Sequence, residues 1–560
     1  MFKKTDPNPQ LDIFTAPSMQ LGSRASKKYS DPNAWHNQFY SLVTTKINEE
    51  IFKPLFPEGK KCGRPNASIR ILVAMSALKE GFGCSDEDLF EKCEFDLLTR
   101  KALGMELLTD VTPSIDTYYL FRRRICEYQE RTGIDLMQLC FEQLAGNQVR
   151  LLKISGKCVR MDSKLIDSNI ARQSRYELIH TTLVKFLKTC TLSDLSPEQE
   201  ERAKEYLKED SSKTVYRSDS DTLQSNLARI GNFIMEMLAT FPATSPAHDL
   251  LQRLFDEQYA VKDGKAVLRD KKEVKADSLQ NPNDPDATYR AKNDQKVQGY
   301  VTNITETVEE GKPNIITSVQ VETAVFADCH FLQEAVENSE RVTDSTIEDL
   351  YADGAYQSPD NREFAKNHNA MQLKTGKMQG GCRWELIPHD EDGLTVREIA
   401  TGNTYEAVKA VTKQGSRKRW RIPWNNKTGW RYFEDKDIKA YQLRKQIESL
   451  PLEEQHKRNN VEAAMFQYSF HTRKGKTRYR GLLKHRMHAY SRCMWMNLRR
   501  MVIFQISTFQ RSIFALFGPI REAFGSFKAI SRKIFTSGVD CYVSLRMTTL
   551  ARLDSKYVPF

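Results

Sequence analysis

The sequence lacks the features that mark secreted and nucleotide-hydrolysing proteins. Its 11 cysteines among 560 residues include no Cys-x-x-Cys pair, and scattered thiols without framework spacing are typical of a reduced, cytosolic protein. The opening residues MFKKTDPNPQLDIF contain no long apolar segment, so no secretory signal is predicted. The Gly-x-x-x-x-Gly-Lys-Ser/Thr motif is also absent, which argues against a nucleotide cofactor. We therefore expect a cytoplasmic protein.

The chain also has no long uninterrupted apolar run. Its most apolar late stretch, MVIFQISTFQRSIFALFGPI, is broken by Gln505, Gln510, Arg511 and Pro519. This pattern indicates a buried or amphipathic helix rather than a membrane span. The composition, 40% hydrophobic and 28% charged, is that of a globular protein. No membrane partner is therefore predicted.

Acidic residues are missing from a long basic segment near the C-terminus. Between Ala463 and Arg521 there is no Asp or Glu, whereas twelve Lys and Arg occur. A run of one charge sign requires either an external anion or acids from elsewhere in the fold. We expect DNA phosphates to be the anion, bound by Arg473, Lys474, Lys476, Arg478 and Arg480. Such contacts contribute affinity and salt dependence but little sequence information.

Two other basic segments are candidates for DNA binding. TPSIDTYYLFRRRICEYQE predicts a helix whose Arg122 and Arg123 could lie along phosphates. SRKRWRIPWNNKTGWRYF places tryptophans among basic residues, and its candidates are Arg417, Lys418, Arg419, Trp420 and Arg421. One of Trp420, Trp424 and Trp430 could stack on an unpaired base. The alternative is that these tryptophans form a small core.

Length and pattern predict several domains. Residues 1–35 are polar and rich in turns, whereas residues 36–150 have helical spacing. The predicted parts are a flexible arm (1–35), a helical N-terminal domain (36–150), a larger mixed domain (151–505) and a helical tail (506–560). Within the mixed domain, residues 172–290 form a helical and polar insertion and residues 371–435 a β-rich insertion. Residues 297–325 alternate as in a β-hairpin with its turn at Glu310-Gly311.

Three carboxylates stand out by their local setting. Val159 to Met161 predict a short buried strand that ends at Asp162, and Asp353 follows a second strand and precedes a glycine. Glu462 lies in a predicted helix. Three converging carboxylates would hold two divalent cations for phosphoryl transfer. The alternative is that Asp162 and Asp353 are turn or capping residues and that Glu462 forms an ion pair with Arg458.

Several segments resemble, in order, those of bacterial DDE-type insertion-sequence transposases. GRPNASIRILVAMSALKEGFGCSDEDLFEKCEFDLLTRKALG and TPSIDTYYLFRRRI resemble the N-terminal helical domain of that family. MDSKLIDSNIA, ADGAYQSPDNREF and the segment from RNNVEAAMFQYSF to NLRRM are similar to the two aspartate motifs and to the glutamate helix with its basic tail. The resemblance covers most of residues 35–505.

The resemblance implies an α/β fold. It predicts a ribonuclease H-like mixed sheet flanked by helices in a catalytic domain (151–505), a helical N-terminal domain for DNA binding or dimerisation (36–150) and a β-rich insertion before the catalytic glutamate. It also implies that Asp162, Asp353 and Glu462 bind two Mg²⁺ or Mn²⁺ ions in each active site.

The sequence departs from the pattern of some related families around the last acid. Arg458 and Glu462 match that pattern, and Arg458 is a further candidate for DNA binding. The Tyr of the pattern falls on Gln455 and its Lys on Ser469. Arg473 or Lys474 are candidates to supply the missing cation. Asp167 is a rival to Asp162 as the first metal ligand, and we prefer Asp162 because the predicted strand leads directly into it.

The implied activity is cleavage at the ends of an insertion sequence and strand transfer into target DNA. The partners would be double-stranded DNA, as terminal inverted repeats and target, and a second copy of the chain, because two ends must be brought together. Two alternatives are a repurposed DNA-binding protein without catalysis and a ribonuclease H-like nuclease that cleaves without joining.

Overall fold

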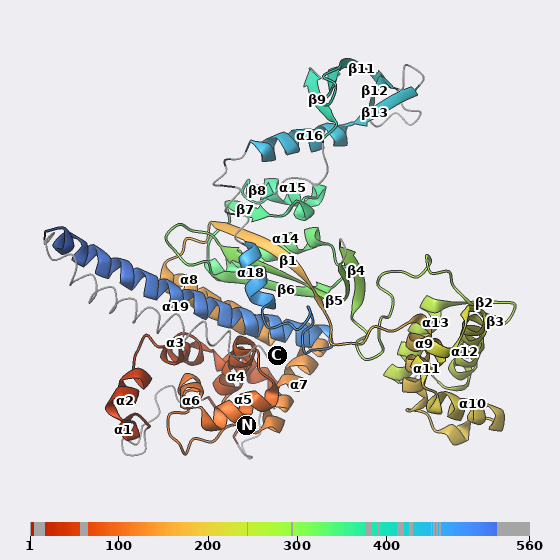
Figure 1. Cartoon of the computed structure of the whole chain (residues 1–560), viewed down its shortest axis with the longest axis horizontal. Helices are drawn as coiled ribbons and strands as arrows, with labels where there is room; N and C mark the ends of the chain where they lie inside the picture. The colour runs from red at the N-terminus through yellow and green to blue at the C-terminus, as the bar shows by residue number, and fades with distance from the viewer. Residues whose placement is uncertain are drawn as a thin grey trace.

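The computed structural model describes residues 2–4, 17–56, 65–242, 245–292, 295–375, 382–389, 393–410, 419–424, 429–449, 451, 454, 457 and 461–523. The chain is an α/β protein. A mixed sheet lies at its centre, N-terminal helices pack below it, and a helical module and a β-rich module extend from it (Figure 1).

The N-terminal part is helical, as predicted. It contains α1 Pro17–Gln20, α2 Ser23–Tyr29, α3 Trp35–Leu42, η1 Thr44–Lys46, η2 Glu49–Leu55, α4 Ile69–Phe82, α5 Asp86–Phe95, α6 Leu97–Leu103, α7 Ile115–Thr132 and α8 Leu136–Leu152. Gly83 ends α4 in the left-handed conformation, and the Ser85 side chain caps α5. The segment predicted as a flexible arm carries α1 and α2, and the Tyr29 side chain is buried.

The central sheet has six strands. They are β1 Cys158–Asp167, β4 Thr288–Lys292, β5 Gln295–Thr307, β6 Ile316–Thr323, β7 Asp349–Ala352 and β8 Gln372–Thr375. β5 is antiparallel to β1, β4 and β6, whereas β1 and β7, and β7 and β8, are parallel. The predicted hairpin is formed by β5 and β6, with Gly311 between them at a φ of 73°.

β1 is longer than predicted, which corrects the placement of Asp162. The strand continues to Asp167, so Asp162 lies at mid-strand, opposite Ile304 of β5, and not at a strand end. Ser163 and Lys164 interrupt the apolar pattern, but β5 pairs with β1 all the way from Val159 to Asp167. Pairing with β5, whose residues lie 132 to 148 positions further along the chain, therefore extends a strand whose own sequence indicates an earlier end.

Helices cover the sheet and connect it to the N-terminal part. They are η4 Asp328–Phe331, α14 Leu332–Thr343, η5 Gly354–Tyr356, α15 Pro359–Asn367, α18 Val461–Ser469 and α19 Leu482–Ala523. α18 packs against β1, and α19 packs against β6, α4 and α8. α19 thus joins the N-terminal helices to the sheet, and Figure 1 shows it lying between them. Within the described residues, no helix has the length and apolar character needed to cross a membrane.

Two modules have hydrophobic cores of their own. The helical module comprises α9 Arg175–Leu187, η3 Leu192–Asp194, α10 Pro197–Lys208, α11 Ser211–Arg217, α12 Ser220–Thr240, α13 Pro246–Gln258, β2 Tyr259–Lys262 and β3 Lys265–Leu268. The β-rich module comprises β9 Trp384–His389, β10 Gly393–Glu398, β11 Thr404–Ala410, β12 Arg419–Trp424, β13 Gly429–Glu434 and α16 Asp435–Glu448.

Candidate active site and basic surfaces

Asp162 lies on β1, and Asp353 directly follows the neighbouring parallel strand β7. The pairing of β1 with β7 runs from Cys158 opposite Asp349 to Arg160 opposite Tyr351, and continuing this register by two residues sets Asp162 beside Asp353. Each carboxylate accepts a hydrogen bond from the following backbone N–H, at 2.8 Å for Asp162 and 2.7 Å for Asp353. The strands therefore hold two carboxylates close together at the centre of the sheet.

The electrostatics of this pair suit a divalent cation. The pKa of Asp162 is raised to about 6, mainly by burial and also by the negative charges of Asp353 and Asp328, although the Ser163 N–H and Lys292 oppose the rise. Two carboxylates that share a poorly solvated site repel each other, and hard cations such as Mg²⁺ bind oxygen ligands of this kind. The donor set of Asp162 and Asp353 therefore fits the implied metal.

Glu462 is positioned differently. It lies in the first turn of α18, as expected for a helical residue, and its side chain is exposed. In the part of the chain that the structure describes, no three His, Cys, Asp or Glu side chains are grouped so that they could hold a metal ion. The structure therefore brings two of the three predicted ligands together, and Glu462 stands on the helix that packs against β1 without joining them.

Asp167, the rival first ligand, has structural partners at the other end of β1. Its carboxylate accepts a hydrogen bond from the Gln298 backbone N–H at 2.8 Å and lies 3.6 Å from the guanidinium of Arg172. Asp167 thereby joins β1 to β5. The geometry favours Asp162 of the two, because Asp162 is the one beside Asp353.

Lys164 is a candidate that sequence reasoning missed. Its ammonium donates a hydrogen bond to the Ser469 hydroxyl at 2.7 Å, which is the position where the resemblance leads one to expect a lysine. Burial lowers the pKa of Lys164, and the charge of Asp162 opposes this. Residues i and i+2 of a strand share a face, so the spacing from Asp162 would have revealed Lys164 had the strand been predicted at its full length.

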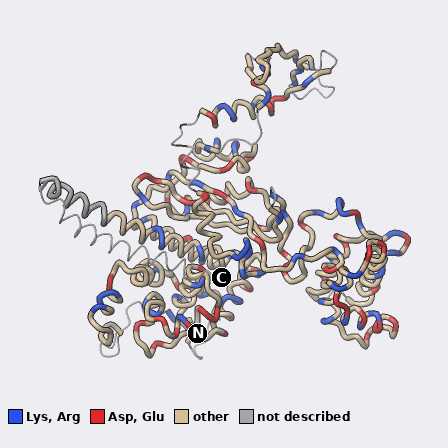
Figure 2. Tube along the Cα trace, viewed as in Figure 1, with Lys and Arg blue, Asp and Glu red and all other residues tan. Residues whose placement is uncertain are grey.

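The basic segment between α18 and α19 is exposed but anchored. Side chains of Lys476, Arg478 and Arg480 donate to the backbone carbonyls of Ile170, Gly83 and Asn169, each at 2.7 Å. Arg473 and Lys474 are exposed. A carbonyl holds a cation in place without neutralising it, so the segment keeps its positive charge. Lys and Arg recur without acidic residues along the coloured part of α19 (Figure 2).

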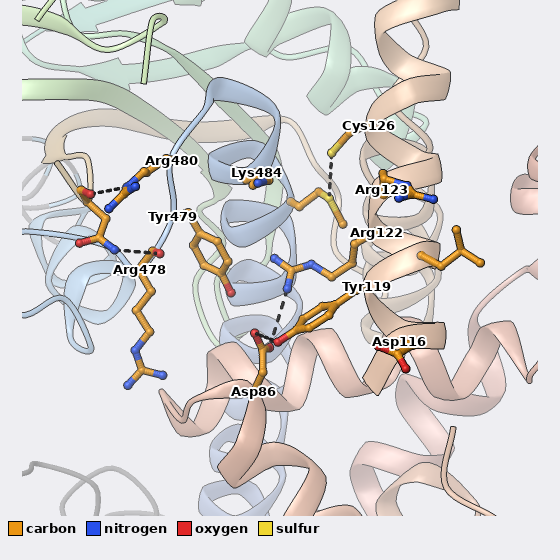
Figure 3. Close-up of a pocket in the computed structure, with 13 residues that line it drawn as sticks. Asp86, Asp116, Tyr119, Arg122, Arg123, Cys126, Arg478, Tyr479, Arg480 and Lys484 are labelled. Atoms are coloured by element: carbon orange, nitrogen blue, oxygen red, sulfur yellow. Dashed lines mark hydrogen bonds and ion pairs between the residues drawn. The ribbon is translucent and has the colours of Figure 1, made fainter. Parts of the chain in front are cut away.

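The two predicted arginines of α7 have different environments. Arg122 is 15% exposed, lies 3.8 Å from Asp86 and stacks over the ring of Tyr479 (Figure 3). Its guanidinium also lies over the ring of Tyr118. Arg123 is 70% exposed. Arg122 is therefore mainly a structural residue that joins α5, α7 and the basic segment, whereas Arg123 is accessible to a ligand.

The β-rich module corrects the prediction for Trp420. This side chain is 4% exposed within the module's core and is not available for stacking on a base. Arg419 and Arg421 point to the other face, with guanidinium groups 4.0 Å and 4.2 Å from the ring centroids of Tyr432 and Trp430. Arg417, Lys418 and Arg458 lie outside the described residues.

Comparison with known proteins identifies the N-terminal helices. Residues 28–124 match the family model described as Transposase domain (DUF772), from the end of α2 into α7. The match supports an insertion-sequence transposase. No curated protein and no solved structure matched the chain.

Proposed function

We propose that this protein is a DDE transposase that cleaves DNA at the ends of its insertion sequence and joins the 3′-hydroxyl groups to target DNA. The observation that carries the proposal is that Asp162, on β1, and Asp353, which directly follows the adjacent strand β7, lie close enough for the charge of Asp353 to raise the pKa of Asp162, in a chain that also contains a transposase domain. Its DNA partners are the terminal inverted repeats and the target. A homodimer is the expected working form, because two ends have to be held together.

The order of the strands supports a ribonuclease H-like catalytic domain. β6, β5 and β1 are antiparallel neighbours, and β7 and β8 continue the sheet beside β1 in parallel. The first aspartate lies on the first strand in chain order, and the second directly follows the first parallel strand. This is the placement that the resemblance to the family implies.

Asp162 and Asp353 would hold the Mg²⁺ or Mn²⁺ ions, with Glu462 as the third ligand from α18. The bound ions would activate the attacking oxygen and stabilise the leaving oxygen of an in-line displacement at phosphorus. Lys164 provides a fixed positive charge two residues from Asp162, suited to orienting a phosphate. The anchored cations after α18 would hold the DNA backbone.

Cleavage of a duplex that contains an end of the element, with Mg²⁺, tests the proposal. Asp162→Asn and Asp353→Asn should each lower the cleavage rate by at least about a hundredfold, since each substitution removes an anionic ligand. Glu462→Gln tests the third position. Asp360→Asn is the matched control, because this carboxylate is exposed on α15.

Three outcomes would contradict the proposal. Full activity of Asp353→Asn would exclude the metal-binding assignment. DNA binding without any metal-dependent cleavage would indicate a repurposed binding protein. Cleavage without joining of pre-cleaved ends to target DNA would indicate a nuclease.

A further inference from the structure

A cavity of about 880 Å³ lies where the transposase domain meets the basic segment. One wall is formed by α5 and α7, and the other by residues 478–487, which include the first turns of α19 (Figure 3). The two walls are more than 350 residues apart in the sequence. The cavity is distinct from the Asp162–Asp353 pair, since neither aspartate lines it.

The contacts between the walls hold the cavity in a defined shape. Arg122 from α7 stacks over Tyr479, and Arg478 donates to the Gly83 carbonyl at 2.7 Å. The Cys126 and Met487 sulfurs are 3.8 Å apart. A ligand in this cavity would therefore touch both parts of the protein at once.

The lining has an excess of positive charge. Arg123, Arg478, Arg480 and Lys484 contribute four cations besides Arg122. Of the two lining acids, Asp86 forms ion pairs with Lys79 at 2.5 Å and Arg122 at 3.8 Å, and accepts a hydrogen bond from the Tyr119 hydroxyl at 3.2 Å. Its charge is balanced within the protein, which leaves Asp116 against the four cations.

These cations are arranged for a polyanion. The guanidinium groups of Arg478 and Arg480 each spend one donor on a backbone carbonyl, and an arginine has five N–H donors, so most remain for a ligand. The exposed pair of Arg123 with Glu127, at 3.4 Å, holds Arg123 only weakly. Leu120 and Met487 add apolar surface to the lining. Such surface suits contact with the sugar rings that lie between the phosphates of a nucleic-acid backbone.

We propose that this cavity binds the sugar–phosphate backbone of duplex DNA, with Arg123 on one wall and Arg480 and Lys484 on the other. The inference rests on the proposed function and specifies where the transposase domain and residues 478–487 hold the same DNA. Duplex DNA is favoured over an acidic protein segment because one wall of the cavity belongs to the acid-free run from residue 463 to 521, which offers a long ligand further cations. Phosphate contacts of this type position DNA without reading its sequence.

The salt dependence of binding to a 30-base-pair duplex of mixed sequence tests this site. Neutralising Arg123 and Lys484 together (Arg123→Gln with Lys484→Gln) should reduce the slope of log K against log salt by about 1.8, since each lost phosphate contact removes about 0.9. At 0.1 M salt this corresponds to about 60-fold weaker binding. Both side chains are exposed, so the thermal unfolding midpoint should not change.

The matched control is Arg124→Gln with Lys204→Gln. Arg124 is the next residue of α7 but does not line the cavity, and Lys204 is exposed on the helical module. This double variant should keep the wild-type slope. Asp353→Asn should also keep it, so that a failure of the catalytic assignment and a failure of this site are measured separately.

A second readout locates the ligand directly. Acetylation followed by mass spectrometry should show Lys484 protected by the duplex and Lys204 unprotected. An unchanged salt slope in the cavity variant, or equal labelling of Lys484 with and without DNA, would overturn the proposal. Protection of Lys484 by poly-glutamate but not by the duplex would also overturn it, in favour of an acidic protein partner.

Discussion

At the scale of single residues, one buried carboxylate joins the transposase domain to α19. Glu80 of α4 lies 2.7 Å from the Nδ1 of His488 and accepts a hydrogen bond from the Tyr479 hydroxyl. Burial alone would raise the pKa of Glu80, but the attraction of His488 and Lys79 and these hydrogen bonds outweigh it and lower the pKa to about 2. Glu80 is therefore ionised in the folded protein over the whole physiological pH range.

This lowered pKa predicts how stability changes with pH. A glutamate in an unfolded chain has a pKa of about 4.3, so the contribution of Glu80 is complete above that value and is lost as the pH falls from about 4.3 to 2. Glu80→Gln should lower the free energy of unfolding at pH 7 by about 1–3 kcal/mol, and the difference from wild type should shrink at pH 3. Urea unfolding at both pH values measures this.

Glu127→Gln is the control for Glu80, because Glu127 is on α7 and 60% exposed. It should change the free energy of unfolding by less than about 0.5 kcal/mol. If Glu80→Gln lowered the free energy of unfolding by the same amount at pH 7 and pH 3, the ionised carboxylate would not be the source of the stability.

Lys164 leads to a prediction about catalysis. Because its ammonium is fixed by Ser469 close to Asp162, Lys164→Gln should lower cleavage by about a hundredfold, the effect of removing one positioned donor for a charged transition state. Lys157→Gln is the control, since Lys157 is 59% exposed and pairs with Glu348 on the surface. Binding of the end-containing duplex should change by less than about threefold in both variants, and a parallel loss of binding and cleavage by Lys164→Gln would indicate a role in holding DNA only.

Local sequence predicted some of these residues and not others. Asp353 was placed correctly because its setting is local, a short apolar strand followed by Asp-Gly. Asp162 was placed at a strand end, and Lys164 was missed, because the continuation of β1 depends on pairing with β5. The position of Glu462 relative to the two aspartates depends on how α18 packs, which no local pattern encodes.

At the scale of elements, the β12–β13 hairpin shows the limit of pattern reasoning. Strand alternation predicts that the hairpin has two faces. Both faces carry Trp and basic residues, so the sequence alone does not decide which face is buried. Packing against β9–β11 decides it: Trp420 and Ile422 point into the core, and Trp430 points out.

The hairpin therefore predicts opposite effects for its two tryptophans. Trp420→Ala should destabilise the β-rich module by about 3–5 kcal/mol, the usual cost of removing a large buried side chain. Trp430→Ala should cost less than about 1 kcal/mol, because its side chain is 49% exposed. Hydrogen exchange of residues 384–434 measures both, and equal loss of protection in the two variants would contradict the assignment of the buried face.

At the scale of the whole molecule, the transposase domain and the sheet share one hydrophobic core. Trp495 of α19 packs against Trp35 and Phe82, with ring centroids 6.2 Å and 5.5 Å apart, and the same cluster includes Ile304 and Val319 of the sheet. The helical module has a separate core. Composition and periodicity predicted that the transposase domain and the helical module are both helical. They did not predict that the first shares its core with the sheet and the second has a core of its own, because contacts between residues about 400 positions apart leave no periodic signal.

This organisation predicts that one substitution where α4 packs against α19 will destabilise the main body, meaning the transposase domain together with the central sheet. The helical module should be unaffected. A Cβ atom at Gly81 of α4 would lie 2.3 Å from the ring of Trp495, so Gly81→Ala forces α4 and α19 apart. Overpacking of this kind costs about 1–3 kcal/mol. Calorimetry should show the transition of the main body at a lower temperature and that of the helical module unchanged.

Gly22→Ala is the control for Gly81, because nothing lies within 4 Å of the added methyl group. The two transitions are assigned by proteolysis during the temperature ramp, with cleavage between residues 175 and 268 reporting the helical module. Since the cavity walls are held by the same junction, Gly81→Ala should also weaken duplex binding, whereas Gly22→Ala should not. A common shift of both transitions would mean that the helical module unfolds with the main body, and the shared core would then extend beyond the transposase domain and the sheet.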